Sequence, residues 1–534
     1  MSTLKIAENF VRWNQGLAGL MLAGSLLAAG PLPLARADEF VDKANKAFAE
    51  ISQARRSDLV LLPLLAKMAP APKSAGTLDS ARSLIPASSG WAEAKAWAEA
   101  GPQKAVLDAL PGLVKETDIQ KSMVFGQPYG VEGVPIDLVR AKLYTDLGDP
   151  ATLSGARFLF LPALDAMQNL VHVEAMRRSD AGDTMGGLTV LADFAVFARQ
   201  IADRQFYKEI DWGVRAITAS VERMRDITYL DSKAKQGLSA KASDELPGLI
   251  ERLDPEKGPL NIARIRLPAG DRIGAEQLMG RVFVNRAGVN TTTFATTMAA
   301  LGSTDRPLRL FSESAKWQSI IPRQKGWFDM NDELPKPYND WAGRWDLEAF
   351  NRRLDTPSYA STLDRGSYAV LAETLPPIDD LFKLRQVMRT EVAGTRAALG
   401  VMGYFYATKS FPPQITSVRP RWVKLFEADP FNPNRGRGAV PPLEYFVPIR
   451  DQTFGPREEP KPHTISIFMP DQANFDLKFK QDQFIIYSAG SDGAKNYASK
   501  VQNTSARVLG ADYLIWPPIK SLFRQYQIDK GDLK

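Results

Sequence analysis

The stretch Gln483-Phe-Ile-Ile-Tyr-Ser-Ala-Gly-Ser-Asp-Gly493 decides how the C-terminal part of this chain is interpreted. Its first half, Phe484 to Tyr487, is aromatic and apolar, which predicts a β-strand. Its second half is rich in Gly, Ser and Asp, which predicts a turn that ends the strand. Upstream lie a second marker, Asp429-Pro-Phe431, and the strand-like run Leu443-Glu-Tyr-Phe446. Together these segments predict one small α/β module at the end of the chain.

The region ahead of this module is predicted to be helical. Residues 158–176, 188–203 and 206–224 carry apolar side chains at helical spacing and are separated by short polar turns. Such helices are typical of an antiparallel bundle or a short solenoid. A longer helix is predicted from Ile378 to Tyr406, before Pro412-Pro413.

We therefore expect a predominantly α protein, a helical bundle or short solenoid, with a C-terminal α+β module of one long helix and a small antiparallel sheet. The sequence divides into residues 1–37 (signal peptide), 38–250 (helical domain), 251–385 (mixed, Trp/acid-rich region) and 386–534 (the α+β module). The binding surface of such a protein is expected on the helical block, because stacked helix pairs leave an extended groove.

Composition excludes several kinds of function. The net charge of +6 is small for 534 residues, and no dense Lys/Arg block occurs, which argues against a nucleic-acid partner. The chain has no Cys and only two His, so thiolate chemistry is excluded and few zinc ligands are available. His172 lies in an apolar helix and is expected to be a satisfied core or groove histidine, while His463 is expected to be exposed, in a loop that enters a strand.

The N-terminus predicts export. Lys5 and Arg12 precede an apolar run over residues 16–30, and Ala35-Arg-Ala37 matches a small-x-small cleavage site. The alternative is an uncleaved membrane anchor. No later stretch is expected to cross a bilayer. We therefore predict a periplasmic or extracellular protein.

The order of markers in the last third resembles the C-terminal half of the major pseudopilin of type II secretion systems. It is similar also to a large group of exported planctomycete proteins that pair a helical N-terminal part with such an ending. The resemblance covers about residues 388–518. The matching positions are Tyr406, Phe411-Pro412, Asp429-Pro430-Phe431, Leu443, Tyr445, Phe484, Tyr487-Ser488, Gly490, Asp492-Gly493 and the run from Ala511 to Pro517. The chain lacks a type IV pilin prepeptide motif, so assembly into a pseudopilus is not expected.

The resemblance also implies a calcium site, because pseudopilins bind Ca²⁺ in the loop after this strand. Calcium takes six to eight oxygen ligands from carboxylates, carbonyls and water. The side chains available for it are Ser488, Asp492, Asn496 and Asp512. Lys495 and Lys500 make the loop less acidic than the pseudopilin loop, and a plain strand-ending turn is the alternative.

A Trp-rich window is the second candidate site. It contains Trp317, Trp327, Trp341 and Trp345, interleaved with the acids Asp329, Glu333, Asp346 and Glu348. Aromatic platforms and two carboxylates are what glycosidases need. The simpler expectation is that these Trp anchor a loop-rich segment onto the helical core.

Other chemistries have weaker signals. Neither Gly-x-Ser-x-Gly nor His-Glu-x-x-His occurs, and no phosphate-binding loop motif is present. Five basic residues surround the Asp-Pro-Phe marker: Arg419, Arg421, Lys424, Arg435 and Arg437. They could bind an acidic partner, but the simpler expectation is that they belong to a solvated loop.

The sequence thus favours a non-enzymatic envelope protein with a structural or protein-interaction role and an envelope or secretion-related protein as its partner. A glycan-binding or glycan-hydrolysing protein using residues 317–348 is the alternative.

Overall fold

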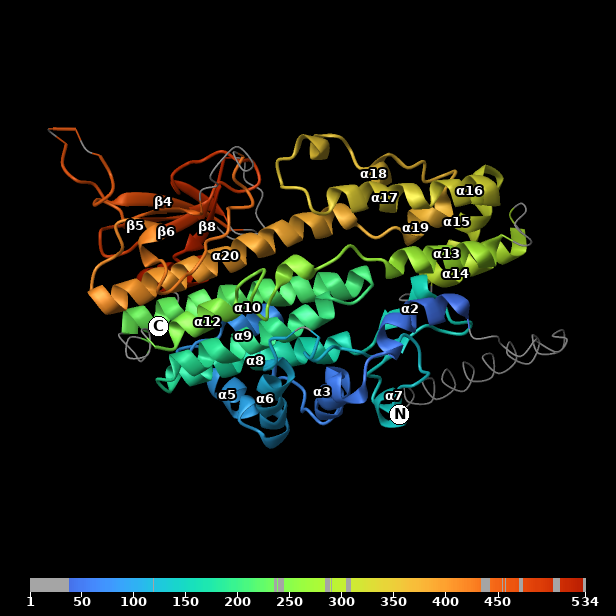
Figure 1. Cartoon of the computed structure of the whole chain (residues 1–534), viewed down its shortest axis with the longest axis horizontal. Coiled ribbons are helices and arrows are strands. Elements are labelled where there is room, and N and C mark those ends of the chain that lie inside the picture. Colours follow the sequence, from blue (N-terminus) through green and yellow to red (C-terminus); the bar gives the residue numbers. More distant parts are fainter. Residues whose placement is uncertain are drawn as a thin grey trace, which may run out of the picture.

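The computed structural model describes residues 38–118, 120–234, 238, 244–283, 289, 291–303, 309–433, 442–453, 455–456, 458–469, 474–502 and 510–531. The predicted signal peptide lies outside these residues, as do Arg435 and Arg437. The described chain is mostly helical, with a small mixed sheet near its C-terminal end (Figure 1). The predominantly α class with a small C-terminal sheet is therefore confirmed.

Three successive helices form the centre of the helical block, as predicted: α8 (Leu161–Asp180), α9 (Thr184–Ala202) and α10 (Tyr207–Ala234). α9 begins at an N-cap, where the Asp183 carboxylate accepts a hydrogen bond of 3.0 Å from the Gly186 N–H. Glycines let α9 approach its neighbours closely. A Cβ at Gly187 would lie 2.5 Å from the Ala175 carbonyl oxygen, and one at Gly213 would lie 2.7 Å from that of Ala198.

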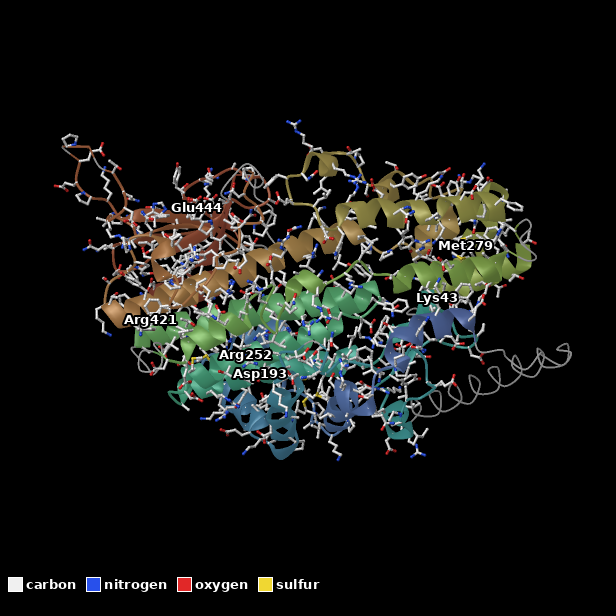
Figure 2. All side chains as sticks on the ribbon, in the orientation of Figure 1. Lys43, Asp193, Arg252, Met279, Arg421 and Glu444 are labelled. Atoms are coloured by element: carbon white, nitrogen blue, oxygen red, sulfur yellow. The ribbon has the colours of Figure 1, made fainter. Side chains whose placement is uncertain are left out.

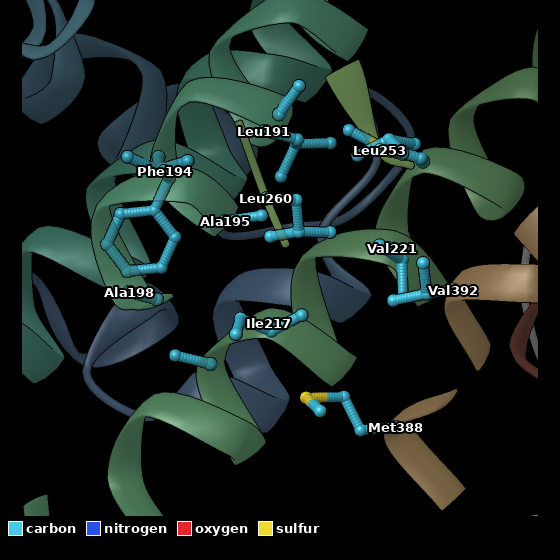
Figure 3. Packing of buried hydrophobic residues seen from close by; sticks show 14 of the residues in the cluster. Leu191, Phe194, Ala195, Ala198, Ile217, Val221, Leu253, Leu260, Met388 and Val392 are labelled. Carbon is cyan, nitrogen blue, oxygen red and sulfur yellow. The ribbon is translucent and has the colours of Figure 1, made fainter. Parts of the chain in front are cut away.

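α9 is also the one described helix that is long and apolar enough to cross a membrane by length and composition. The sequence predicts no such stretch after residue 37, but 89% of the most apolar window of α9 is buried inside the fold. Figure 3 shows side chains of this core, among them Phe194, Ile217, Leu253 and Val392. α9 therefore has the environment of a core helix.

Shorter helices surround this centre. On the N-terminal side they are α2 (Glu39–Ala49), α3 (Ser57–Leu65), α4 (Leu78–Ser83), α5 (Trp91–Ala98), α6 (Gly101–Val114) and α7 (Ile136–Arg140). A two-stranded antiparallel pair, β1 (Thr145–Asp146) and β2 (Arg157–Phe158), precedes α8. α12 (Leu246–Arg252) follows α10 and packs on α9 and on the long helix α20.

The region between 251 and 385 is helical rather than mixed where the structure describes it. Its helices are α13 (Gly270–Val282), α14 (Thr291–Ser303), α15 (Leu310–Ile320), α16 (Trp327–Glu333), α17 (Pro335–Arg344), α18 (Tyr359–Thr362) and α19 (Ala369–Thr374). The run Ile262–Leu267, whose strand-like pattern is one reason to expect a mixed region, forms no strand, because Ile262–Arg264 is a 3₁₀ turn. A six-residue apolar run becomes a strand only where another strand offers backbone partners, and none pairs with it among the described segments. These helices enclose a hydrophobic cluster of their own around Phe294, Trp317 and Met330.

The long helix α20 (Ile378–Thr408) joins the two halves of the molecule and matches its predicted extent closely. It packs on α10 along one side and on strands β6 and β8 along another. It passes without a break through residues 385 and 386, where the sequence placed a domain boundary. The main hydrophobic cluster includes both helical-block and sheet residues, so the two share one core.

The C-terminal sheet has six strands in the order β3-β6-β8-β7-β4-β5. They are β3 (Glu444–Phe446), β4 (His463–Phe468), β5 (Phe475–Phe479), β6 (Ile485–Ser488), β7 (Lys500–Gln502) and β8 (Asp512–Trp516). The expectation of an antiparallel sheet is wrong, because β7 runs parallel to both β4 and β8. Alternation of side chains predicts that a segment is a strand but carries no information about the direction of its neighbours. α21 (Ile519–Lys530) closes the chain against α10 and β8.

Residues that carry the pseudopilin resemblance meet in this module. Ser488 at the end of β6 donates a hydrogen bond of 2.8 Å to the carboxylate of Asp429, and both residues are buried. The rings of Phe484 and Trp516 stack with centroids 5.0 Å apart. The Tyr445 hydroxyl donates to the Pro412 carbonyl oxygen at 2.8 Å. The markers therefore form the inside of the module.

Candidate interaction groove

A groove of about 880 Å³ lies beside strand β3. Its volume falls in the range of protein ligand sites, about 300–1,000 Å³. The sequence led us to expect a binding groove on the helical block, whereas this groove belongs to the C-terminal module. The groove residues are Pro413, Gln414, Ile415, Thr416, Pro442, Leu443, Glu444, Tyr445, Phe446, Asp451, Gln452, Thr453, Glu458, His463, Tyr487 and Tyr497.

Strand β3 forms one edge of the sheet and also one wall of the groove. Its three residues pair with β6 only, through the register Glu444↔Tyr487, Tyr445↔Ile486 and Phe446↔Ile485. Alternate N–H and C=O groups of an edge strand point away from its partner. Among the described residues, no backbone partner occupies that outer side of β3. The groove therefore offers unpaired main-chain donors and acceptors.

Aromatic side chains supply much of the groove wall. The Phe446 ring meets Tyr487 edge-on at 6.2 Å and His463 at 5.1 Å between centroids, so these three rings hold one another in place. Tyr445 is half-buried and is fixed through its hydroxyl to Pro412. Tyr497 differs from the others because it is 71% exposed, on a backbone with φ of +52°. Its ring is therefore open to solvent at the groove.

The charges that line the groove are negative. Glu444, Asp451 and Glu458 are carboxylates, and no Lys or Arg is among the described lining residues. Glu444 pairs with Lys495 and Asp451 with Arg450, and neither cation is among the described lining residues. Glu458 has no cationic partner within 4 Å in the described part of the chain. Figure 2 shows Glu444 on the sheet module, far from Met279 near the other end of the molecule.

His463 adds no positive charge to the groove at neutral pH. Burial lowers the pKa of its imidazole, and Nε2 has no hydrogen-bond partner among the described residues. Its Nδ1 lies 3.2 Å from the Gln452 amide nitrogen. Burial also raises the pKa of Tyr445 to about 12, so this tyrosine keeps its proton. The prediction that His463 lies in an exposed loop is wrong, because it begins strand β4 and is half-buried.

A second, smaller cavity of about 70 Å³ lies where the helical block meets the module. Its walls are charged. Arg225 of α10 pairs with Glu391 of α20, which also accepts a hydrogen bond from the Tyr513 hydroxyl of β8. Beside it, burial would raise the pKa of Asp226, but Arg524 and Arg223 lower it to about 2. These buried pairs tie α10, α20, β8 and α21 together, and a structural role accounts for them.

His172 lies in the helical core near this cavity. It is fully buried, and neither ring nitrogen has a hydrogen-bond partner among the described residues. The expectation of a satisfied histidine is therefore wrong. Burial, with Arg223 and Arg82 adding to it, lowers the pKa of this imidazole well below its usual range. A neutral ring without a carboxylate or hydroxyl partner is not placed as a catalytic base.

The four Trp of the 317–348 window do not share one site. Trp341 and Trp345 are 2% and 4% exposed and pack on Phe382 in the main core. Trp317 is 1% exposed in the second cluster, and Trp327 packs half-buried against that cluster. Sugar rings stack on exposed aromatic faces, so these side chains offer no open platform. They anchor the segment to two hydrophobic cores.

Two of the acids in this window are engaged in local contacts. Glu333 accepts a hydrogen bond from the Tyr359 hydroxyl and pairs with Lys336 at 2.8 Å. Asp346 pairs with Arg385 at 3.3 Å. These partners hold the carboxylates to separate parts of the segment.

The candidate calcium residues come together only in part. Asp492 and Asp512 face the same loop, where Asp512 accepts the N–H groups of Asn496 and Ala498 and Asp492 accepts that of Gly510. Asn496 turns its amide N–H₂ toward the Gly510 carbonyl, and Ser488 bonds Asp429 instead. No group of three or more His, Asp or Glu that could hold a metal occurs among the described residues. The donor set does not fit Ca²⁺, because backbone N–H groups already occupy its carboxylates.

Burial raises the pKa of Asp512 to about 6, and the nearby Asp492 and Glu444 add to this effect. The bound N–H groups of Ala498 and Asn496 oppose it. Because the pKa is higher in the folded state than the ordinary value of 3.8, protonation of Asp512 favours the folded protein over the unfolded chain.

The described basic residues near the Asp-Pro-Phe marker are likewise in local contacts. Arg419 donates to the Lys424 carbonyl oxygen at 2.9 Å, and Arg421 lies over the Trp422 ring. Lys424 pairs with Glu251 at 2.9 Å. They fasten this loop to itself and to α12.

Part of the groove was visible in the sequence. Tyr445 and Tyr487 are markers of the module, and Phe446 follows the first of them. Asp451, Glu458 and Tyr497 lie in irregular segments without periodicity, and only the pairing of β3 with β6 brings them together. Comparison with family models, with curated proteins and with solved structures found no match to this chain.

Proposed function

We propose that this chain is a non-enzymatic protein of the cell envelope that binds an extended segment of another envelope polypeptide in the groove beside β3. The observation that carries the proposal is a groove of about 880 Å³ along a sheet edge without a main-chain partner in the described chain. Open sheet edges bind extended peptides through main-chain hydrogen bonds. The groove belongs to a module that shares its core with the helical block, which makes it a rigid surface.

The location in the envelope is supported by the N-terminal pattern of Lys5 and Arg12, an apolar run and a small-x-small site. A pseudopilin-like C-terminal module is part of the same proposal. Its support is the meeting of Asp429 with Ser488 and of Phe484 with Trp516. This resemblance implies a partner related to secretion. The absence of a catalytic role is supported by the histidines, since His463 contacts an amide and His172 contacts no polar group among the described residues.

The test is a capture experiment that depends on the groove. The chain without residues 1–37 is immobilised and exposed to envelope extract, beside a Tyr497→Ala/Glu458→Gln variant and an Asp108→Asn control. Asp108 is an exposed acid on α6, remote from the groove. We expect an envelope polypeptide that is retained by the parent and the control, is lost with the groove variant, and rebinds when purified. Equal retention by all three proteins would contradict the proposal. Cell fractionation tests the location, and a cytoplasmic chain would contradict it.

A further inference from the structure

We infer that the segment bound in this groove is a cationic β-strand, which pairs with the outer edge of β3 and places a Lys or Arg side chain among Phe446, Tyr497 and the groove carboxylates. This inference rests on the proposed function and specifies the chemistry of the partner.

The sheet edge sets the conformation of the partner. The three residues of β3 expose alternate N–H and C=O groups on the side away from β6. Leu443 to Phe446 line the groove consecutively, so the groove follows the strand. A helix satisfies its own backbone groups and has none to offer to such an edge. An extended segment can form these hydrogen bonds while its alternate side chains enter the groove.

The groove lining sets the charge of the partner. Glu444, Asp451 and Glu458 line the groove, and the described lining contributes no Lys or Arg; Glu444 and Asp451 are already paired with Lys495 and Arg450, so Glu458 carries the charge argument. Glu458 accepts the Gly455 N–H at 3.4 Å and has no cationic partner within 4 Å among the described residues, so it is available to an incoming cation. Aromatic faces attract cations as well, and the 71% exposed ring of Tyr497 is open to that contact. Carboxylates beside aromatic rings form a surface that suits Lys and Arg side chains.

The rest of the molecule makes this groove distinctive. The chain has a net charge of +6, so its overall field repels a cationic segment, and attraction has to come from the groove itself. The opposite sheet edge, β5, alternates apolar residues with Asp476 and Lys478. Charges of both signs on an edge strand discourage pairing with another chain. A cationic strand is therefore expected to pair with β3, beside the groove carboxylates, and not with β5.

The probes are three end-blocked octapeptides. The first alternates Val with Lys, the second alternates Val with Glu, and the third is the Lys peptide with Pro in place of two central Val residues. Calorimetric titration of the chain without residues 1–37 measures their binding at low and at moderate salt. We expect the Lys peptide to bind at least tenfold more tightly than the Glu peptide. The Pro peptide should lose binding, because Pro cannot donate to a strand.

Groove variants locate the binding. Tyr497→Ala should weaken the Lys peptide about two- to fivefold, which corresponds to about 0.5–1 kcal/mol for an exposed cation–ring contact. Tyr497→Phe, which keeps the ring, should bind as the parent does. Glu458→Gln should weaken the Lys peptide by a similar factor and reduce the salt dependence of binding, whereas Asp108→Asn should change neither.

The outcomes separate this inference from the proposed function. Equal binding of the Lys and Glu peptides, full binding of the Pro peptide, or loss in Asp108→Asn as large as in Glu458→Gln would overturn the cationic strand. Competition by a soluble oligosaccharide such as cellohexaose would overturn it also, in favour of a glycan. If the peptides fail while capture from extract still depends on the groove, the inference is wrong and the proposed function stands.

Discussion

The ion pair between Arg225 and Glu391 gives the sharpest test of how the two halves of the molecule are held together. Arg225 lies on α10 and Glu391 on α20, and their side chains are 4% and 2% exposed. Glu391 also accepts the Tyr513 hydroxyl of β8, and Arg225 donates to Thr395 at 2.6 Å. Replacing Glu391 by Ala would leave the Arg225 charge buried without its carboxylate and the Tyr513 hydroxyl without its acceptor.

The expected cost follows from that burial. Removing one partner of a buried ion pair destabilises a protein by about 3–5 kcal/mol, because the remaining charge is uncompensated. Replacing both partners by apolar residues of similar size is about neutral. We therefore expect Glu391→Ala and Arg225→Met each to lower the free energy of unfolding by about 3 kcal/mol or more. The double variant Arg225→Met/Glu391→Met should recover most of that loss.

The assay is a double-mutant cycle in urea, followed by tryptophan fluorescence and by far-UV circular dichroism. The control is the pair Arg215–Asp211 on the same helix, whose side chains are 61% and 22% exposed. Its loss through Asp211→Asn should cost about 0.3–0.5 kcal/mol. The reasoning is refuted if Glu391→Ala costs no more than the control, or if the double variant loses the sum of the single losses.

Three further predictions concern the core and the loop after β6. Gly213→Ala should destabilise the protein by about 1–3 kcal/mol, because its Cβ would lie 2.7 Å from the Ala198 carbonyl oxygen. The control is Gly280→Ala, which has open space around it and should stabilise α13 by about 0.5–1 kcal/mol. Equal effects on the unfolding midpoint would contradict the close approach of α9 and α10. Asp512 has a folded pKa of about 6 against an ordinary 3.8, so its contribution to stability is present below about pH 4 and is lost as the pH rises through 6. Asp512→Asn should therefore show a smaller fall in unfolding free energy between pH 4 and pH 7 than the parent, and an unchanged fall would contradict this. Millimolar Ca²⁺ should leave the unfolding midpoint unchanged; a rise that Asp492→Asn abolishes would show that the loop does bind the ion.

The long helices could be predicted because their signals are local. Apolar spacing over 19 to 31 residues and polar or Pro-containing ends predicted α8, α9 and α20 to within about four residues, whereas α10 runs ten residues beyond its predicted end at residue 224. Strands β3 and β6 were predicted for the same reason, since each has an apolar or aromatic run. β5 and β7 were not predicted: β5 alternates over five residues only, and β7 is three residues long.

Other features depended on contacts between distant parts of the chain. The sequence shows that Glu444 and Glu458 are acidic, but it does not show that they line one groove. That arrangement follows from the position of β3 at the edge of the sheet. The four Trp residues lie close together in the sequence, yet they divide between two hydrophobic cores. Trp341 and Trp345 pack on Phe382 of α20, whereas Trp317 lies on α15, which packs on α14.

The sequence by itself determined the helical character of the chain, the extent of α8, α9 and α20 and the markers of the C-terminal module. Helical character and strand markers depend on residues that lie close to one another along the sequence. The tertiary structure alone decided the parallel placement of β7, the burial of Trp341 and Trp345, the unpartnered His172 and the groove beside β3. Each of these depends on which segments meet in space, and pairing partners far apart in the chain leave no periodic signal in either segment.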